Sequence, residues 1–149
     1  MVDLNIKGVL HVTAAVLPGM IRQASGHVIN LSSIAGRKLF KGLGVYSGTK
    51  NFVAAFSDIM RMEIGKKHNI RVTSIQPGAV DTELFEHISD KVYKEAMESL
   101  REQMTFLSPE DIAQSVIYVL EAPDHVGVSE LLFCRSTRSG RSLSNLVQE

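Results

Sequence analysis

The amino-acid sequence predicts an α/β fold that forms part of a doubly wound, Rossmann-like parallel sheet. Hydrophobic periodicity alternates several times between helical and strand spacing along the 149 residues. Helical segments separate the strand-like segments, which favours parallel pairing of the strands. The composition, with 44% hydrophobic and 21% charged residues, is that of one globular domain of ordinary size.

The first half of the sequence predicts two helices and two strands. The first helix has a broad apolar face, and Pro18 and Gly19 are expected to bend or weaken it near its end. The first strand is a nearly continuous apolar run, which suits a strand covered on both faces. The expected elements are a helix over 2–23, a strand over 26–33, a loop over 34–43, a helix over 45–67 and a strand over 70–76 that Pro77 and Gly78 stop.

The second half predicts shorter elements. Two rather polar helices are expected over 81–88 and 91–104. A strong helix start follows them, because Ser108 is a good N-cap and Pro109 suits the first helical position. The remaining expected elements are the end of this helix near Pro123, a strand over 128–134 and a surface tail over 135–149.

The chain opens with a helix that no strand precedes, and three strands make a thin sheet for this fold class. A dinucleotide-binding half begins with a strand and a Gly-rich turn that leads into a helix. Gly42, Gly44 and Gly48 precede a helix without a strand immediately before them, so we interpret them as a flexible loop. We therefore expect residues 1–149 to be the carboxyl-terminal portion of a single domain, without the N-terminal dinucleotide-binding half.

Charge and cysteine content narrow the function classes. Sixteen basic residues balance sixteen acidic ones, so neither nucleic acid nor a membrane surface is expected as a partner. Cys134 is the single cysteine, which excludes an intramolecular disulfide and fits a reducing, cytoplasmic setting. No signal-peptide pattern and no run of about 18 uncharged apolar residues is present, so no membrane span is expected. The five histidines show no metal-ligand spacing, so no metal site is expected.

Tyr46 and Lys50 are four residues apart near the start of the second helix, which places them on one face. A phenol with a pKa near 10 is a poor base at neutral pH, and a nearby ammonium lowers that pKa by favouring the phenolate. The pair can then move a proton to or from a substrate oxygen. Such a pair also arises by chance, so it needs support from other residues.

Ser33 lies at the carboxyl end of the first strand, where open α/β sheets place their ligands. Its hydroxyl can hydrogen-bond the same substrate oxygen as Tyr46. The alternative is a turn or cap serine, a role that Ser32 beside it can also fill. Pro77 and Gly78 end the second strand on the same edge of the sheet. The alternative to a functional role is that these two residues only form the turn that ends the strand.

Four segments in register resemble the short-chain dehydrogenase/reductase family. They are DLNIKG with Asn5, INLSS with Ser33, YSGTK with Tyr46 and Lys50, and PGAVDT over 77–82. The separation of 13 residues from Ser33 to Tyr46 is the usual one in that family. The stretches VLPGMI and SPEDIA resemble most the branch that oxidises serine and 3-hydroxy acids.

The resemblance implies a catalytic role for each matched residue. Tyr46 would be the general acid/base, and Ser33 would orient and polarise the carbonyl. Lys50 would lower the pKa of Tyr46 and bond the nicotinamide ribose. Asn5 would hold a water in a proton relay to Lys50.

The resemblance also implies a cofactor and partners. The cofactor would be NADP or NAD, with NADP slightly preferred, and Thr82 would contact its carboxamide. The chain would interconvert a small-molecule alcohol and a carbonyl by hydride transfer, as a homo-oligomer, a dimer or a tetramer. The residues that would bind the cofactor are Tyr46, Lys50, Pro77, Gly78, Val80 and Thr82.

One alternative stays open. The glycine motif, the cofactor selector and the Asn-Ala-Gly segment of the family are absent from the sequence. A truncated, non-catalytic isoform that binds another subunit through its helices and a bare sheet edge fits this absence. For the polypeptide alone we expect weak or no dinucleotide affinity.

Three further groups of residues have two interpretations each. Phe85, His87, Met97 and Met104 lie where the family has its substrate lid, and ordinary packing is favoured over substrate contact. Phe52, Phe56 and Ile59 form a helical stripe that is core, with part of it an interface between subunits. Arg135, Arg138 and Arg141 are expected to be solvated, with anion binding as the alternative.

Overall fold

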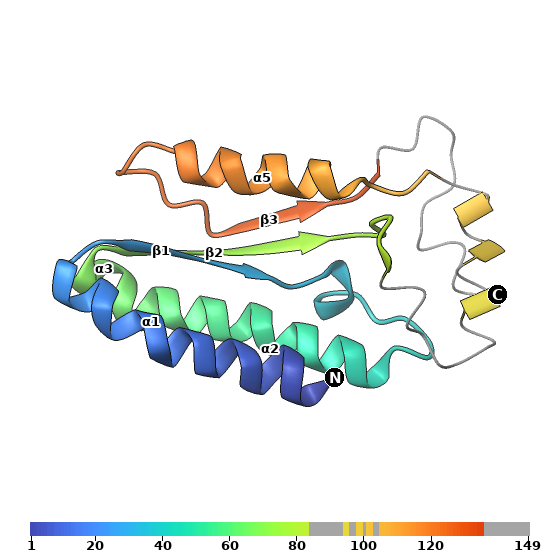
Figure 1. Cartoon of the computed structure of the whole chain (residues 1–149), viewed down its shortest axis with the longest axis horizontal. Coiled ribbons are helices and arrows are strands. Elements are labelled where there is room, and N and C mark those ends of the chain that lie inside the picture. Colours follow the sequence, from blue (N-terminus) through green and yellow to red (C-terminus); the bar gives the residue numbers. More distant parts are fainter. Residues whose placement is uncertain (84–93, 96–97, 100, 103–104, 136–149) are drawn as a thin grey trace.

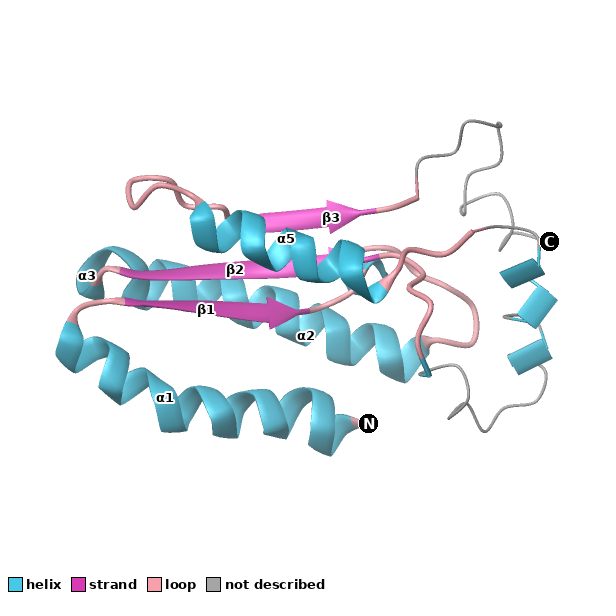
Figure 2. Cartoon of the chain, turned by 45° about the horizontal axis from the view of Figure 1, so that its top comes forward, coloured by secondary structure: helices cyan, strands magenta, loops and turns pink. Residues whose placement is uncertain are grey.

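The chain folds into three layers, with a parallel β-sheet between helices on its two faces (Figures 1 and 2). The structure is a computed structural model and describes residues 1–83, 94–95, 98–99, 101–102 and 105–135. Helices α1 (Val9–Gln23) and α2 (Gly44–Met60) cover one face, and helix α5 (Pro109–Glu121) covers the other. The prediction of an α/β fold with a parallel sheet is confirmed.

The strand order is β1-β2-β3, and both pairings are parallel. Strand β1 (Gly26–Leu31) pairs with β2 (Ile70–Pro77) along its whole length, and β2 pairs with β3 (Glu130–Phe133) at its carboxyl end. The carboxyl ends of β1 and β2 therefore meet at one edge of the sheet. Ser33, Pro77 and Gly78, which the sequence analysis selected, lie at this edge.

The first predicted helix forms, but its first turns differ from an α-helix. A wide π-type turn, η1 (Asp3–Gly8), leads without a break into α1. The helix continues five residues beyond Pro18 and ends where Ala24 adopts a left-handed conformation, with φ 49°. The predicted end of this helix at residue 23 is confirmed.

The second predicted helix also forms and extends slightly further than expected. Helix α2 continues through a second π-type turn, η3 (Arg61–Gly65), into the short α3 (Lys66–His68). Asn69, with φ 54°, ends it in a left-handed conformation that asparagine tolerates better than most residues.

The strand bounds differ from the prediction at four ends. The first strand stops at Leu31 rather than at residue 33, because the Ser33 side chain caps a 3-10 turn, η2 (Ile34–Gly36), in the expected loop. The second strand includes Pro77, and the third covers four residues rather than the seven expected over 128–134.

Helix α5 begins as the sequence predicts. The Ser108 side chain accepts from the Asp111 backbone N–H, the Asp111 carboxylate accepts from the Ser108 backbone N–H, and Pro109 is the first helical residue. This capping box satisfies two of the donors that a helix start leaves unpaired.

The core lies on both faces of the sheet. On the α1 and α2 side, Met60 packs with Ile70 and Val72 of β2. On the other side, α5 contacts β2, and its Val119 is fully buried. The sheet is therefore covered on both faces, as the apolar strands predict.

Much of α1 faces solvent. Within the described part of the chain, one helix, Asp3–Gln23, passes the length and composition test for a membrane span, with a mean hydropathy of 1.4 and 6% of the window buried. The sequence analysis expected no span because charged residues interrupt the run. A single helix of this kind near a chain start is weak support for a membrane span, since core helices and signal sequences pass the same test.

His27 of β1 makes a hydrogen bond that indicates which ring nitrogen carries the proton when the imidazole is neutral. Its Nε2 lies 2.8 Å from the Thr73 hydroxyl, which donates its only hydrogen to Val128 O at 2.6 Å. Nε2 must therefore be the donor, which leaves Nδ1 without a proton. That atom is buried and has no partner among the described residues. Burial, aided by the charge of Arg71, lowers the pKa of His27 below its usual 6.5.

This histidine should make the free energy of unfolding fall in mild acid. Because the folded-state pKa is lowered, the unfolded chain takes up the proton first, and stability is lost as the pH falls from 6.5 through the folded-state pKa. Chemical denaturation just below pH 6.5 should show a smaller loss for His27→Gln than for the wild type. The exposed His125→Gln serves as the control, and an equal loss in all three proteins would contradict the assignment.

Candidate functional site

The selected residues come together where β1 and β2 end beside the first turns of α2. Ser33 follows β1, and Pro77 and Gly78 end β2. Tyr46 and Lys50 stand one turn apart on α2, on the side that faces this edge. The parallel sheet and the single crossover helix therefore position all of these groups.

Ser33 takes the cap role that the sequence left open, and its role toward a substrate oxygen stays a prediction. Its Oγ accepts from the Ala35 backbone N–H at 3.1 Å, which makes it the cap of the η2 turn, and lies 3.4 Å from Pro77 O. A side-chain hydrogen bond also joins Ser33 to Tyr46 and lowers the pKa of that phenol. Ser33 is buried, so its orientation is fixed by these contacts.

The pKa of Tyr46 is higher in the structure than the sequence analysis expected. Burial raises the pKa of Tyr46 above 10.0 and outweighs the opposing bond from Ser33. The Lys50 ammonium lies 5.8 Å from the centre of the Tyr46 ring and donates to Leu31 O at 3.0 Å. The cause that lowers the pKa of Tyr46 in this geometry is Ser33. That Lys50 also lowers the pKa of Tyr46 stays a prediction.

Lys50 is itself held in a partly desolvated environment. Burial lowers the pKa of Lys50 below its usual 10.5. Its single backbone contact to Leu31 O uses one of three ammonium donors.

Asn5 contacts α2 through a residue that the sequence analysis missed. Asn5 Nδ2 donates to Thr49 Oγ1 at 3.0 Å, and the Thr49 hydroxyl donates to Tyr46 O at 2.8 Å. Thr49 is buried and stands between the two helices. Its place three residues after Tyr46 in YSGTK was the signal that could have found it.

The turn after β1 is fastened to α2 at three points. Ser32 Oγ donates to Lys50 O at 2.7 Å, and Asn51 Nδ2 donates to Gly36 O at 3.0 Å. Between them, a Cβ placed on Gly36 would lie 2.8 Å from the carbonyl carbon and oxygen of Lys50. The sequence analysis considered Ser32 only as a cap and did not select Gly36 or Asn51.

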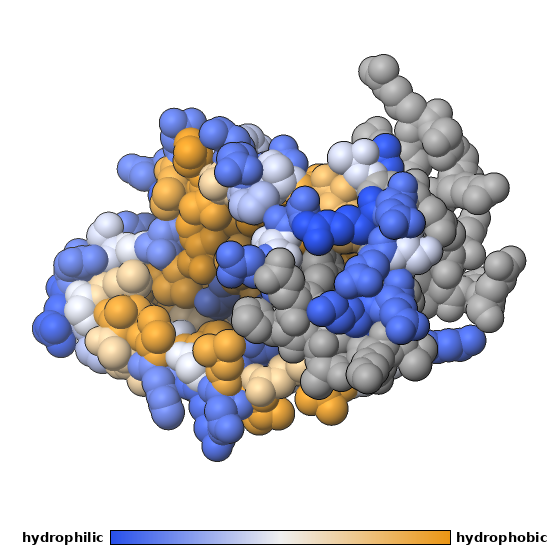
Figure 3. All heavy atoms as spheres, turned by 45° about the vertical axis from the view of Figure 1, so that its right-hand side comes forward, coloured by the Kyte–Doolittle hydropathy of each residue, from blue (hydrophilic) through white to orange (hydrophobic). Residues whose placement is uncertain are grey.

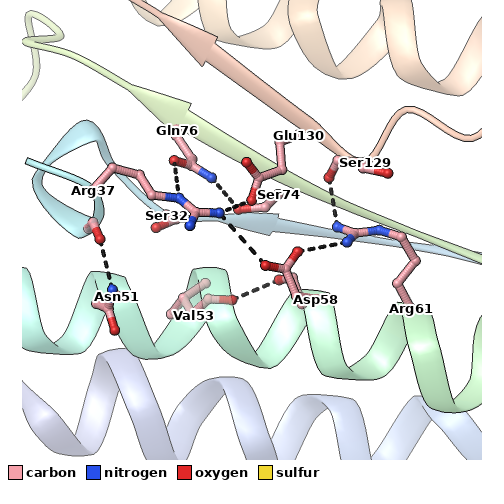
Figure 4. A network of polar contacts seen from close by, with 12 residues as sticks. Ser32, Arg37, Asn51, Val53, Asp58, Arg61, Ser74, Gln76, Ser129 and Glu130 are labelled. Atoms are coloured by element: carbon pink, nitrogen blue, oxygen red, sulfur yellow. Dashed lines mark hydrogen bonds and ion pairs between the residues drawn. The ribbon is translucent and has the colours of Figure 1, made fainter.

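Arg37 anchors the far end of the same turn (Figure 4). Its guanidinium donates to Gln76 Oε1 at 3.3 Å and forms ion pairs with Glu130 of β3 and Asp58 of α2. Figure 4 shows these groups converging from different elements. The turn that carries Ser33 is thus tied to the sheet and to the helix.

The segment after β2 is also fixed by backbone contacts. Gly78 N–H donates to Phe133 O at 2.8 Å, and Val80 forms a parallel bridge with Leu107. Asp81 forms an ion pair with Arg101. Val80 and Thr82 are partly buried, and their contact with a cofactor stays a prediction.

The remaining candidates from the sequence analysis lie away from this edge of the sheet or outside the described residues. Phe52 and Phe56 stack with ring centres 5.6 Å apart, whereas Ile59 is 49% exposed. Arg135 is exposed, and the described residues contain no group of three side chains suited to a metal ion. The candidates that lie outside the described residues are Phe85, His87, Met97, Met104, Arg138 and Arg141.

A family model described as short chain dehydrogenase matches residues 1–92. The chain belongs to the short-chain dehydrogenase family. The resemblance found in the sequence is therefore confirmed at the level of the family, and the fold agrees with it.

Similar proteins extend the match along most of the chain. An uncharacterized oxidoreductase of Staphylococcus saprophyticus is 44% identical over 142 residues, which cover 93% of this chain and 56% of that protein. A closed form of serine dehydrogenase complexed with NADP+ is 33% identical with a TM-score of 0.80, over 96% of this chain and 58% of its own. A 4-hydroxyisoleucine dehydrogenase complexed with NADH is 25% identical with a TM-score of 0.71, over 88% of this chain and 55% of its own. The chain thus spans a little over half the length of these relatives.

The contact between Gly36 and α2 gives a stability prediction. Gly36→Ala should lower the free energy of unfolding by about 1–3 kcal/mol, because the new methyl group collides with the Lys50 backbone rather than with a flexible side chain. Gly48→Ala is the matched control, since no atom lies within 4 Å of its Cβ position in α2. That change should stabilise the helix by about 0.5–1 kcal/mol. Equal thermal midpoints for the two variants would refute the close contact.

Proposed function

We propose that this chain carries the catalytic groups of an NAD(P)-dependent oxidoreductase that interconverts a small alcohol and a carbonyl compound. The observation that carries the proposal is the placement of Ser33, Tyr46 and Lys50 at one edge of the sheet. The Ser33 side chain there lowers the pKa of Tyr46, and the Lys50 ammonium donates to Leu31 O one helical turn away. Ser33 follows β1, whereas Tyr46 and Lys50 lie on successive turns of α2. All three nevertheless face one edge of the sheet. A purely structural arrangement does not require two hydroxyls and an ammonium to be half-buried together.

The donor set fits a nicotinamide cofactor and an oxygen-bearing substrate. Two adjacent hydroxyls can bind one substrate oxygen, and the Lys50 ammonium retains donors for ribose hydroxyls. The cofactor supplies the hydride, and the protein supplies position and proton transfer. Pro77, Gly78 and Thr82, together with Val80, would border the nicotinamide from the end of β2.

Tyr46 acts as the general acid/base of this proposal. Because burial raises its pKa, the phenol is protonated at neutral pH and is ready to donate a proton to a carbonyl oxygen. Ser33 polarises the same oxygen and favours the phenolate that remains. Asn5 supports the helix turn through Thr49, and a proton relay from there to Lys50 stays part of the proposal.

The cofactor proposed first is NADP, with NAD as the second candidate. The relative with the higher TM-score, 0.80, is complexed with NADP+, and the 4-hydroxyisoleucine dehydrogenase is complexed with NADH. Serine or a related 3-hydroxy acid is the first substrate class to examine, since serine dehydrogenase is among the similar structures. The proposal treats residues 1–149 as the catalytic portion of one domain, with 135–149 as a tail.

A second candidate is a non-catalytic interaction protein or a partner in a homo-oligomer. Figure 3 shows apolar side chains gathered on one face of the molecule, between α5 and α1. Leu4 and Val12 of the first helix are 76% and 64% exposed, and Leu31 on the outer strand is 52% exposed. Exposed apolar side chains that gather on one face are typical of a protein–protein contact surface.

The decisive experiment compares two tyrosine variants of the full-length protein as it occurs in its source. With serine or a 3-hydroxy acid and NADP+, Tyr46→Phe should lower kcat/KM by about 10²–10⁴-fold, because the proton-transfer group is lost. Tyr118→Phe is the matched control, since Tyr118 is 61% exposed on α5.

Retention of activity in Tyr46→Phe would contradict the enzyme proposal. Absence of turnover in the wild type, with partner binding intact in Tyr46→Phe, would favour the interaction protein.

A further inference from the structure

Asn51 makes a contact that neither the core nor the helix requires. It follows Lys50 on α2 at an exposed position, and its amide leaves the helix surface to donate to Gly36 O at 3.0 Å (Figure 4). Gly36 is buried and ends the short turn that Ser33 begins. The amide therefore reaches from the residue after Lys50 to the turn that carries the other candidate hydroxyl.

This turn is short enough to transmit a displacement of Gly36 to Ser33. The Gly36 backbone N–H donates to Ser33 O at 2.9 Å, and the Ser33 side chain accepts from Ala35 N–H. On its outer side the turn is held by Arg37, which reaches Gln76. On the α2 side, Asn51 supplies the side-chain bond closest to Gly36.

We propose that Asn51 is a positioning residue: its amide clamps the Ile34–Gly36 turn onto α2 and thereby fixes the Ser33 hydroxyl against the Tyr46 hydroxyl. This inference rests on the proposed function. The effect of Asn51 passes through Ser33, because the contact of its amide is with Gly36 O. Small displacements of a catalytic group cost large factors in rate, so one surface amide can control kcat.

The test uses the full-length enzyme in the alcohol-oxidising direction. Asn51→Ala and Asn51→Asp should each lower kcat by about 10- to 100-fold with little change in the KM for the dinucleotide. The aspartate keeps the size of the side chain but has no donor for Gly36 O. Gln23→Ala is the matched control: Gln23 Nε2 donates to Ser25 O at 2.7 Å at the far end of α1, and its loss should leave kcat unchanged.

Two readouts separate positioning from a merely structural role. Ser33 lowers the pKa of Tyr46, so loosening the turn should shift the rising limb of the kcat/KM profile to higher pH. In a Ser33→Ala background, Asn51→Ala should cause no further loss of kcat, because the two residues act as a unit. A full, additive loss in that background, or an unshifted pH limb, would overturn the inference.

The failure of this inference is distinguishable from failure of the proposed function. If Tyr46→Phe and Ser33→Ala strongly lower turnover while Asn51→Ala retains the wild-type kcat, only the role of Asn51 is refuted. If Tyr46→Phe retains activity, the proposed function itself is refuted. Thermal unfolding of Asn51→Ala near the wild-type midpoint confirms that the exposed substitution leaves the fold intact.

Discussion

The turn after β1 and the turn of α2 that carries Lys50 approach so closely that only glycine fits between them. A Cβ at Gly36 would meet the Lys50 carbonyl at 2.8 Å, and hydrogen bonds from Ser32 and Asn51 flank this contact. The approach brings the hydroxyl at the end of a strand to the hydroxyl at the start of a helix. The candidate site depends on this packing contact, because Ser33 and Tyr46 are 13 residues apart and share no secondary-structure element.

Burial has opposite consequences for the two titratable groups of the site. It raises the pKa of Tyr46 and lowers that of Lys50, so it disfavours the charge on each. The hydrogen bond from Ser33 works against burial and favours the phenolate. The pKa of Tyr46 thus depends on the balance between burial and the Ser33 hydroxyl. The Lys50 ammonium donates to Leu31 O and has further donors for another acceptor.

Local chemistry explains which features the sequence could predict. The N-cap at Ser108, the Tyr46–Lys50 spacing and the place of Ser33 close to the end of the first strand each depend on a few neighbouring residues, and the structure contains all three. The π-type turn of η1, the link from Asn5 to Thr49 and the clamp at Asn51 depend on how distant segments pack. The pKa of Tyr46 belongs to the second group, because burial is a tertiary property that helical spacing does not reveal.

The most direct measurement is a titration of Tyr46 by NMR with ¹³C-labelled tyrosine, since the chain has only three tyrosines. The Tyr46 resonance is assigned with Tyr46→Phe, and its pKa is compared between the wild type and Ser33→Ala. The account predicts a wild-type pKa above 10.0 that rises further when the Ser33 hydroxyl is removed. An unchanged pKa in Ser33→Ala would show that the two hydroxyls are not paired and would contradict the assembly of the site.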